Sequence, residues 1–291
     1  APLTVTRGLI HDYLGMRLDY STPGAVKIRM DDYVTNILSE TPSCLLEGRG
    51  DSTPAASHLF DVNADKRRLD EAQTETFHHL VAKLLYLSKR ARPDVHLAVA
   101  FLCTRVQSPD EDDWKKLGRC LRYLKSNPDL CLTLHADDMS SIYWWVDASF
   151  AVHPNCRSHT GAAVTFGRGS AINISSKQKI NTRSSTEAEL VGINDALTMV
   201  LWVRLFLEGQ GFQVKDNIVL QDNKSTILLA KNGKRSSGRH TRHIDIRYYF
   251  ITDNVRRGTT SIEHCPTDQM AADFFTKPLQ GSLFRRLRSV I

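Results

Sequence analysis

The sequence has few cysteines, and they follow no pattern. The six cysteines, at positions 44, 103, 120, 131, 156 and 265, include no CxxC pair and show no regular spacing. Disulfide-stapled domains and zinc modules repeat their cysteines at short intervals, so this spacing argues against both classes. We therefore expect reduced thiols in an intracellular chain.

Long apolar runs are missing as well. No run approaches the ~18 uncharged apolar residues of a membrane span, and the richest one, Val95–Cys103, is closely flanked by Arg92 and Arg105. We therefore expect no membrane partner. The first residues, Ala1-Pro2-Leu3-Thr4, include neither an initiator Met nor a signal peptide, so we expect a piece of a longer protein.

Size and charge set broad limits. The 291 residues are typical of two domains, and a hydrophobic content of 41% is ordinary for a globular protein with a core. The formal net charge of +6 is a weak indication of a polyanionic partner.

The first residues predict a strand pair and a helix. Leu14–Tyr20 and Ala25–Met30 alternate in polarity on either side of a turn at Ser21–Gly24, which predicts two strands. Asp31 and Asp32 then open a helix, and we interpret them as capping residues. Polymerase aspartates sit in a hairpin turn between strands, so this context does not indicate a polymerase site.

The rest of the first half contains no visible chemistry. Residues 39–72 are polar and rich in Ser, Asp, Gly and Pro, which predicts a long loop. Helices are predicted over Thr76–Leu87, from Arg92-Pro93 onward, and over Pro109–Lys125. Their apolar residues recur at helical spacing, so we expect a helical module with a packed core.

From residue 131 onward, strands and helices alternate. Gly167–Ser170 is expected to be a hairpin turn, since it lacks the third glycine and the following helix of a dinucleotide-binding loop. Strands are predicted at 130–135, 142–150, 160–166, 171–175, 218–221 and 259–264, and helices at 184–209, 223–231, 244–254 and from near Thr267.

Four of these elements carry a carboxylate. Asp147 and Asp222 follow strand-like runs, whereas Glu189 and Asp273 lie in helix-like ones. Carboxylates held by separate rigid elements can fix hard divalent cations such as Mg2+, and two cations ~3.5–4 Å apart can clamp both oxygens of a phosphodiester exchange. The order of the four motifs therefore indicates a nuclease.

The predicted helix over 184–209 offers two glutamates, Glu187 and Glu189. Two residues apart on a helix, they point about 200° apart, so only one can face the edge of the sheet. Glu189 directly precedes the apolar run that starts at Leu190, and we take it as the ligand. Glu187 stays the alternative; its structural role would be a favourable charge near the helix N-terminus.

These motifs resemble those of a known family. Residues 138–291 are similar to the ribonuclease H domain in the Pol polyprotein of copia-type LTR retrotransposons. Residues 1–137 look like the C-terminal part of the reverse transcriptase that precedes it, without the Tyr-x-Asp-Asp hairpin of the polymerase site. The motifs that carry the resemblance are Tyr13-Leu14-Gly15-Met16, Arg92-Pro93-Asp94-Val95, Val146-Asp147-Ala148-Ser149, Ser158-His159-Thr160-Gly161, Ser185-Thr186-Glu187-Ala188-Glu189, Gln221-Asp222-Asn223-Lys224-Ser225, Arg242-His243-Ile244-Asp245 and Ala271-Ala272-Asp273-Phe274-Phe275-Thr276-Lys277-Pro278-Leu279.

The resemblance implies an α/β, ribonuclease H-like fold. The sheet would be mixed and five-stranded, with three antiparallel strands followed by two parallel ones and with helices on its flanks. A smaller, mainly helical thumb or connection module over residues 1–137 would precede it, so the boundary between the two domains is expected between residues 137 and 138.

The resemblance also implies an endoribonuclease that cleaves the RNA strand of RNA/DNA hybrids during reverse transcription. Asp147, Glu189 and Asp222 would hold one Mg2+ that activates a water, and Asp147, Asp222 and Asp273 would share a second; Mn2+ can substitute. Two alternatives stay open: a non-catalytic ribonuclease H-fold module that binds nucleic acid, and an integrase or transposase of the same superfamily. The latter class orders its acids Asp, Asp, Glu, whereas here the glutamate comes second.

Further residues are predicted around the site. His264 could assist product release or proton transfer, or it could be a structural residue at a strand end. The expected partners are an RNA/DNA hybrid, the upstream palm and fingers of a reverse transcriptase, and a second copy of the chain in a homodimer. The expected location is the cytoplasm, in a virus-like particle, or the nucleus. A basic surface that tracks phosphates is expected from Lys231, Lys234, Arg235, Arg239, Arg242 and Arg247.

Overall fold

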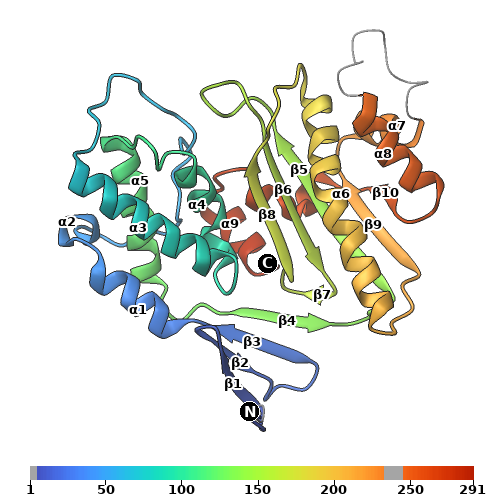
Figure 1. The fold of residues 1–291 in the computed structure, drawn as a ribbon, viewed down its shortest axis with the longest axis horizontal. Helices are drawn as coiled ribbons and strands as arrows, with labels where there is room; N and C mark the ends of the chain where they lie inside the picture. Colours follow the sequence, from blue (N-terminus) through green and yellow to red (C-terminus); the bar gives the residue numbers. More distant parts are fainter. Residues whose placement is uncertain (1–4, 233–244) are drawn as a thin grey trace, which may run out of the picture.

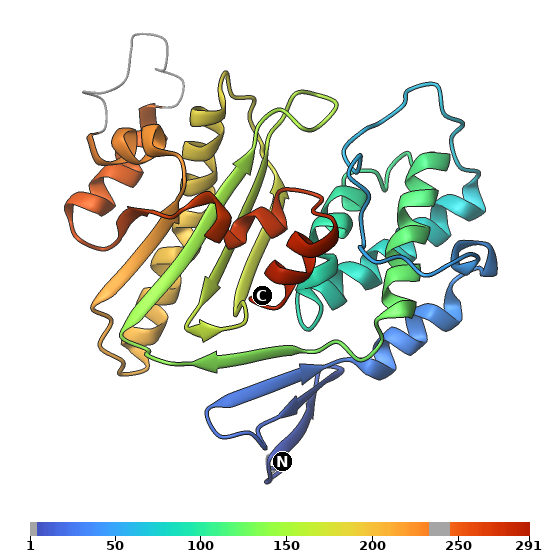
Figure 2. The same ribbon diagram turned by 180° about the vertical axis from the view of Figure 1, so that it is seen from behind.

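A computed structural model describes residues 5–232 and 245–291. The chain forms a helical half and a sheet half, which lie side by side above a small hairpin sheet (Figures 1 and 2). Each half has its own hydrophobic core, but the last part of the chain crosses from the sheet half back to the helical half.

The N-terminal hairpin differs from the predicted strand pair. It contains β1 (Ile10–Tyr13), β2 (Met16–Asp19) and β3 (Ala25–Arg29), all antiparallel. The strand predicted over Leu14–Tyr20 is therefore wrong at its start, where Leu14 and Gly15 form a turn with φ values of 50° and 74°. A tight hairpin turn of this kind needs positive φ at both central residues, and a leucine rarely supplies it, so the alternating pattern concealed the turn.

Helix α1 (Asp31–Glu40) begins where it was predicted, but the role of its two aspartates differs. The N-cap residue is Met30, and no side chain caps the helix. Asp31 and Asp32 lie inside the first turn, where negative charge is favourable, and Asp31 accepts a hydrogen bond of 2.8 Å from Arg29 Nε. The predicted capping role is therefore wrong.

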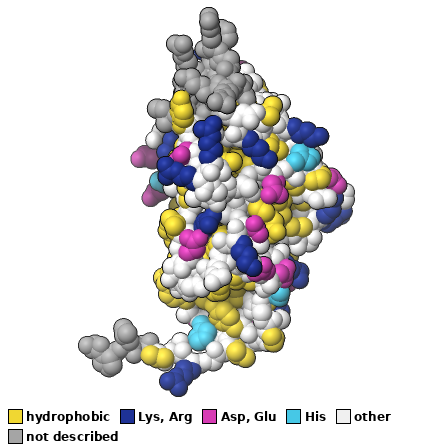
Figure 3. Space-filling view, turned by 90° about the vertical axis from the view of Figure 1, so that its right-hand side faces the viewer, with side chains coloured by type: hydrophobic (Ala, Val, Ile, Leu, Met, Phe, Trp, Pro, Cys, Tyr) yellow, Lys and Arg dark blue, Asp and Glu magenta, His cyan; other side chains and the backbone are white. Residues whose placement is uncertain are grey.

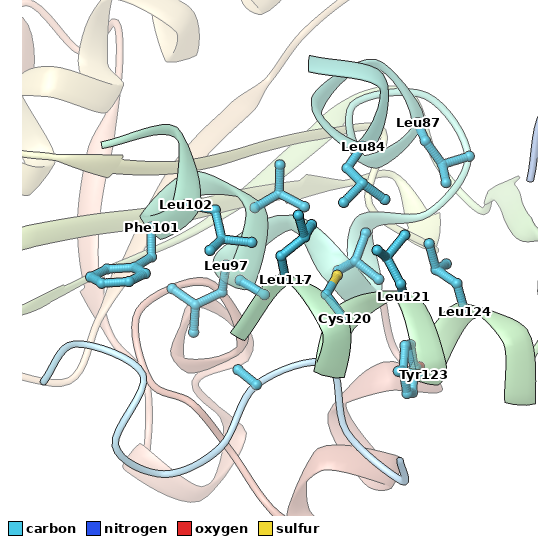
Figure 4. Close-up of a cluster of buried hydrophobic side chains, with 14 of the residues drawn as sticks. Leu84, Leu87, Leu97, Phe101, Leu102, Leu117, Cys120, Leu121, Tyr123 and Leu124 are labelled. Atoms are coloured by element: carbon cyan, nitrogen blue, oxygen red, sulfur yellow. The ribbon is translucent and has the colours of Figure 1, made fainter. Parts of the chain in front are cut away.

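The helical half contains α2 (Ser43–Leu46), α3 (Glu71–Ser88), η1 (Pro93–Val95), α4 (His96–Cys103) and α5 (Glu111–Ser126). Helix α3 starts earlier than predicted because Asp70 and Gln73 form a capping box that satisfies its first backbone N–H groups. Leucines and aromatic residues from α3, α4 and α5 fill the core between these helices, as Figure 4 shows. The predicted helical module with a packed core is confirmed.

The sheet half has the predicted topology. Its strands are β5 (Ser141–Ser149), β6 (His159–Thr165), β8 (Ile172–Lys177), β9 (Asp216–Gln221) and β10 (Ser261–His264), in the order β10-β9-β5-β6-β8. Strands β5, β6 and β8 pair antiparallel, while β9 pairs parallel with both β5 and β10. Three antiparallel strands followed by two parallel ones confirm the ribonuclease H-like fold class.

Both faces of this sheet are covered. Helix α6 (Ser185–Gly209) packs on one face, where Ala162 and Val164 of β6 join its core. On the other face Ala163 belongs to the core of the helical half, where β6 contacts the 3-10 segment η5 (Ala271–Phe275) and β8 contacts α4. Every residue of β6 is buried as a result.

Helices α7 (Lys224–Asn232) and α8 (Asp245–Arg256) lie beside α6 at the β10 edge of the sheet. By length and composition α6 could cross a membrane, although Asp195 and Arg204 interrupt its apolar residues, so it contains no uncharged run of the length expected for a span. Half of its apolar window is buried inside the protein, where it forms the core under the sheet.

The terminal helix predicted from near Thr267 is wrong. The chain there forms two 3-10 turns, η4 (Thr267–Gln269) and η5, before α9 (Gly281–Arg288). Adjacent aromatic residues explain the difference, because Phe274 stacks on Phe284 of α9 while Phe275 contacts His96 of α4. Because Phe274 and Phe275 are adjacent but are buried against different elements, the segment follows the surface of the sheet and does not form one long helix.

Strand β4 (Leu132–Ala136) joins the two halves. It pairs with β3 on one side and with β7 (Gly167–Arg168) on the other, so the predicted turn at Gly167–Ser170 also carries a short strand. The resulting sheet, β1-β2-β3-β4-β7, takes strands from both sides of residue 137. Phe284 and Leu287 of α9 also belong to the core of the helical half, so the two predicted domains share extensive contacts.

Candidate active site

The candidate site lies where β5 and β9 end and α6 begins. Parallel pairing sets Trp145 opposite Leu220, so Asp147 and Asp222 reach the same edge of the sheet. Glu189 comes to this edge from the second turn of α6. One ligand oxygen from each of Asp147, Glu189 and Asp222 lies within 4.8 Å of the others.

Asp147 is held from the far end of the chain. The residue is buried and only 2% exposed, and β5 has a neighbouring strand on each side in the sheet. Its Oδ2 atom accepts a hydrogen bond from the Thr276 hydroxyl and lies 3.7 Å from Lys277 Nζ. These two residues directly follow η5, so docking of that segment fixes the central carboxylate.

Glu189 is held by a buried glutamine. Gln221 Nε2 donates to Glu189 Oε2 at 3.1 Å and to the Val146 carbonyl at 3.2 Å, which ties the α6 carboxylate to both parallel strands. Burial, and then the neighbouring Asp147 carboxylate, raise the pKa of Glu189 well above its usual range. The ionised form of Glu189 is therefore unfavourable in the protein alone, and a bound cation would stabilise it.

Glu187 has a different function in the fold. Its Oε2 accepts the Arg183 backbone N–H at 2.8 Å, while its own N–H donates to Ser184 Oγ at 3.2 Å. These reciprocal contacts close the N-terminus of α6. Glu187 lies outside the group of three carboxylates, whereas Glu189 lies within it.

Asp222 and Asp273 complete the acidic set from two other directions. Asp222 is half-buried and accepts a hydrogen bond of 3.1 Å from Thr267 Oγ1 of η4. Asp273, in η5 rather than in the predicted helix, is buried and pairs with Lys277 Nζ at 2.6 Å. Burial, and then the Asp147 carboxylate, raise the pKa of Asp273, so the two acids share one electrostatic environment.

The donor set fits a hard divalent cation. Carboxylate oxygens are the ligands that Mg2+ and Mn2+ prefer, and here they come from rigid strands, a long helix and a docked segment. Within the described residues no other group of three His, Cys, Asp or Glu side chains meets in this way. Three of the four acids predicted from the sequence therefore meet at one edge of the sheet, while Asp273 lies outside this group and is linked to Asp147 through Lys277.

The predicted auxiliary histidine ends β10. His264 pairs with Gln221 across the two parallel strands, and its ring is exposed. It therefore lies at the edge that carries the acidic set and contributes little to the core. A role in product release stays a prediction.

Only part of the predicted phosphate-contacting surface can be described. Lys231 is exposed on the last turn of α7, whereas Arg247 is half-buried on α8, where its charge partly offsets the burial that raises the pKa of Asp195 on α6. On the described part of the face formed by α6, α7 and α8, basic and acidic side chains are interspersed (Figure 3). Lys234, Arg235, Arg239 and Arg242 lie outside the described residues.

Three residues at the site were not predicted as site residues: Gln221, Thr276 and Lys277. Each lies in a motif that contains a predicted acid: Gln221 directly precedes Asp222, while Thr276 and Lys277 follow Asp273 by three and four residues. The signal in the sequence was a polar side chain near an acid in an otherwise apolar strand or turn. Such a side chain needs a hydrogen-bond partner when its amide or hydroxyl is buried.

No family model matches the chain. It is 29% identical over 249 residues to the retrovirus-related Pol polyprotein from transposon TNT 1-94 of Nicotiana tabacum, and 28% identical over 279 residues to that from transposon RE2 of Arabidopsis thaliana. These matches cover 82% and 95% of this chain but 18% of each relative, so the chain spans less than a fifth of their length. The predicted resemblance to retrotransposon Pol polyproteins is confirmed.

Solved structures give a weaker comparison. LC11-RNase H1, isolated from compost by a metagenomic approach, aligns with a TM-score of 0.35 and 17% identity over 46% of this chain and 91% of that one. LC11-RNase H1 in complex with an RNA/DNA hybrid aligns with a TM-score of 0.34 and 16% identity over 46% and 93%. Since both TM-scores are low, the fold class rests on the strand order and directions of the sheet itself.

Proposed function

We propose that the chain is a metal-dependent ribonuclease H that cleaves the RNA strand of RNA/DNA hybrids. The observation that carries the proposal is the meeting of Asp147, Glu189 and Asp222, whose ligand atoms lie within 4.8 Å of one another at the edge of a ribonuclease H-like sheet. The similarity to retrovirus-related Pol polyproteins supports the same substrate, because the reverse transcription that the resemblance implies passes through such hybrids.

The carboxylates divide between two cation positions. Asp147, Glu189 and Asp222 would hold one Mg2+, and Asp147, Asp222 and Asp273 a second, with Mn2+ as a substitute. When bound, such ions activate a water and neutralise charge on the attacking and leaving oxygens of the scissile phosphate.

The chain's own residues prepare this site before substrate arrives. Gln221 donates a hydrogen bond to the Glu189 carboxylate, and the Thr276 hydroxyl donates one to the Asp147 carboxylate. Both acidic side chains are therefore held in one orientation before substrate binds. The buried positions of Asp147 and Glu189 keep bulk water away from one side, which strengthens every charge interaction with a phosphodiester on the other.

The partners follow from the same proposal. An RNA/DNA hybrid would be recognised through its minor groove, where 2′-hydroxyls identify the RNA strand, and Lys231 and Arg247 are candidates for phosphate contacts. We further propose an upstream reverse transcriptase palm and fingers, no membrane partner, and a location in a cytoplasmic virus-like particle or the nucleus. A homodimer stays a hypothesis for the oligomeric state.

The first test is Mg2+-dependent cleavage of a labelled RNA/DNA hybrid, with single-stranded RNA and duplex DNA as competing substrates. Asp222→Asn should lower the cleavage rate by about 10²–10³-fold, because it removes a charge shared by both cation positions. Asp216→Asn, an exposed acid at the opposite end of the same strand, is the matched control and should leave the rate unchanged.

Each outcome has a defined meaning. Cleavage of the hybrid that is lost in Asp222→Asn and kept in Asp216→Asn would support the proposal. Tight binding of the hybrid without cleavage, in Mg2+ and in Mn2+, would replace the proposed nuclease by the non-catalytic module. Cleavage or joining of duplex DNA would point to the integrase or transposase class.

A further inference from the structure

We infer that Lys277 is a built-in counter-cation of the acidic site. Its ammonium neutralises Asp147 and Asp273 while no divalent cation is bound, and it has to leave these oxygens when a cation enters. The second half of this inference rests on the proposed metal-dependent function. The first half concerns only the protein itself.

The position of the ammonium group carries the inference. Lys277 Nζ lies 2.6 Å from Asp273 Oδ1 and 3.7 Å from Asp147 Oδ2, so it bridges the two acids that would share a cation position. No other Lys or Arg of the described residues forms an ion pair with either acid. The lysine side chain is 41% exposed, whereas those of Asp147 and Asp273 are 3% and 12% exposed.

The backbone around Lys277 fixes this arrangement. The Thr276 carbonyl accepts a hydrogen bond of 3.0 Å from Ser149 Oγ, and the Lys277 N–H donates to the Asp273 carbonyl at 2.9 Å. The Thr276 hydroxyl donates to the same Asp147 oxygen that faces the ammonium. The segment is thus anchored to β5 and closed as a turn, and the lysine stem leads from this turn into the acidic cluster.

The charge of the ammonium stabilises the two acids. Buried carboxylates that face one another repel, and an unpaired buried charge is strongly destabilising. A lysine ammonium can compensate two such charges when no metal ion is present. Because its stem is partly exposed, it can swing to solvent without breaking the fold.

A consequence for metal affinity follows. The ammonium and a divalent cation compete for the same two carboxylates, those of Asp147 and Asp273, so each weakens the binding of the other by the same factor. Lysine would thereby stabilise the empty site and hold the affinity for the second cation in a moderate range.

The test compares Lys277→Met with the wild-type chain and with Lys277→Arg, which keeps the charge. In EDTA we expect the midpoint of thermal unfolding to fall in Lys277→Met and to be largely retained in Lys277→Arg. In a Mn2+ titration followed by the electron paramagnetic resonance of the free ion, Lys277→Met should bind about tenfold more tightly, within the usual range of coupling between sites. Lys215→Met, an exposed lysine remote from the acids, should change neither quantity.

A second variant keeps the inference testable if Lys277→Met folds poorly. Adding Asp273→Asn removes the acid that the ammonium pairs with, so the double variant should be more stable in EDTA than Lys277→Met alone. Equal stability of the two would overturn the inference, as would unchanged unfolding and unchanged Mn2+ affinity in Lys277→Met.

The outcomes separate this inference from the proposed function. Suppose that Lys277→Met is less stable in EDTA and binds Mn2+ more tightly, while the wild-type chain cleaves no hybrid. This result would support the counter-cation role and contradict the proposed nuclease function. If the wild-type chain cleaves the hybrid but replacement of Lys277 changes neither stability nor Mn2+ affinity, the nuclease function would be supported and the counter-cation role would be contradicted.

Discussion

Gly161 of β6 pairs with Asp147 across the sheet and lets the η5 segment pack directly on the strands. A Cβ at this position would lie 2.6 Å from Thr276 Cγ2 and 2.9 Å from the Ala272 carbonyl oxygen. Both distances are shorter than van der Waals contact, so glycine is needed for close approach rather than for an unusual φ. The residue that permits docking thus lies beside the acid that docking fixes.

Replacement of Gly161 by alanine should therefore push the η5 segment off the sheet. We expect Gly161→Ala to lower the free energy of unfolding by about 1–3 kcal/mol, the range for overpacking a well-packed site. Urea unfolding measures this change. Gly209→Ala is the matched control: no atom would meet a Cβ there within 4 Å, so that variant should be neutral or more stable. Equal effects of the two substitutions would contradict the close packing.

At the residue scale, the sequence identified acids more readily than the groups that orient them. Asp147, Asp222 and Glu189 follow from strand ends and helix phase, which are local properties. Thr276 and Lys277 act on Asp147 across more than a hundred residues of sequence, and no periodicity predicts such a contact. Their roles follow only once the fold has brought η5 to the sheet.

Among the elements, helix α5 begins in the acidic run 110–113, which supplies its N-terminal cap. Asp110 accepts hydrogen bonds of 3.0 Å from the backbone N–H groups of both Asp112 and Asp113, which caps the helix. Arg105 then bridges the side chains of Asp110 and Asp113 at 3.1 and 2.9 Å. This buried network ties the end of α4 to the start of α5.

The cap makes Asp110→Ala a sharp test at this scale. Loss of the cap alone should lower the free energy of unfolding by about 1–2 kcal/mol. Asp112→Ala, in the same acidic run but with only long ion pairs to lysines, should change it by no more than ~0.5 kcal/mol. Chemical denaturation of both variants measures the difference. Similar losses from both substitutions would mean that the run acts through its total charge.

Element type was predictable where apolar periodicity was strong, as in α3, α5, α6 and the five strands of the mixed sheet. It failed where geometry depended on single residues, as at the left-handed Leu14, or on tertiary burial, as at Phe274 and Phe275. Hydrophobic spacing reports which face of an element is buried, but it does not report that two neighbouring residues are buried against different partners.

On the scale of the whole molecule, the two halves meet at a polar seam. His153 Nε2 lies 3.0 Å from His159 Nδ1, and His159 Nε2 lies 2.8 Å from Ser175 Oγ. Phe60 of the helical half packs against both histidine rings. The seam is thus buried, and its histidines are held neutral.

Stability should therefore depend on pH through this seam. Burial, and then the charge of Lys177, lower the pKa of His153 from 6.5 to about 4, so between these values the unfolded chain binds a proton that the folded protein does not. The stabilisation is present above pH 6.5 and is lost, at about 1.4 kcal/mol per pH unit, as the pH falls toward 4. His96, on the side of the helical half, is also neutral in this pH range, because burial lowers its pKa to about 3.

Comparison of the wild-type chain with His153→Gln isolates this residue from the carboxylates that titrate nearby. The slope of the unfolding free energy against pH, measured by urea unfolding between pH 7 and 5, should be smaller in the variant by about one proton. Identical slopes would show that the pKa of His153 in the folded protein is close to its pKa in the unfolded chain.

The four acids at the sheet edge also set an order of events during synthesis. Strand β5 and Asp147 leave the ribosome long before η5, which brings Asp273, Thr276 and Lys277. A nascent chain that has formed the sheet therefore still lacks the residues that hold its central carboxylate. The arrangement delays the complete acidic site until the segment after β10 has been made, so a chain that ended at β10 would carry the five strands of the mixed sheet without a finished site.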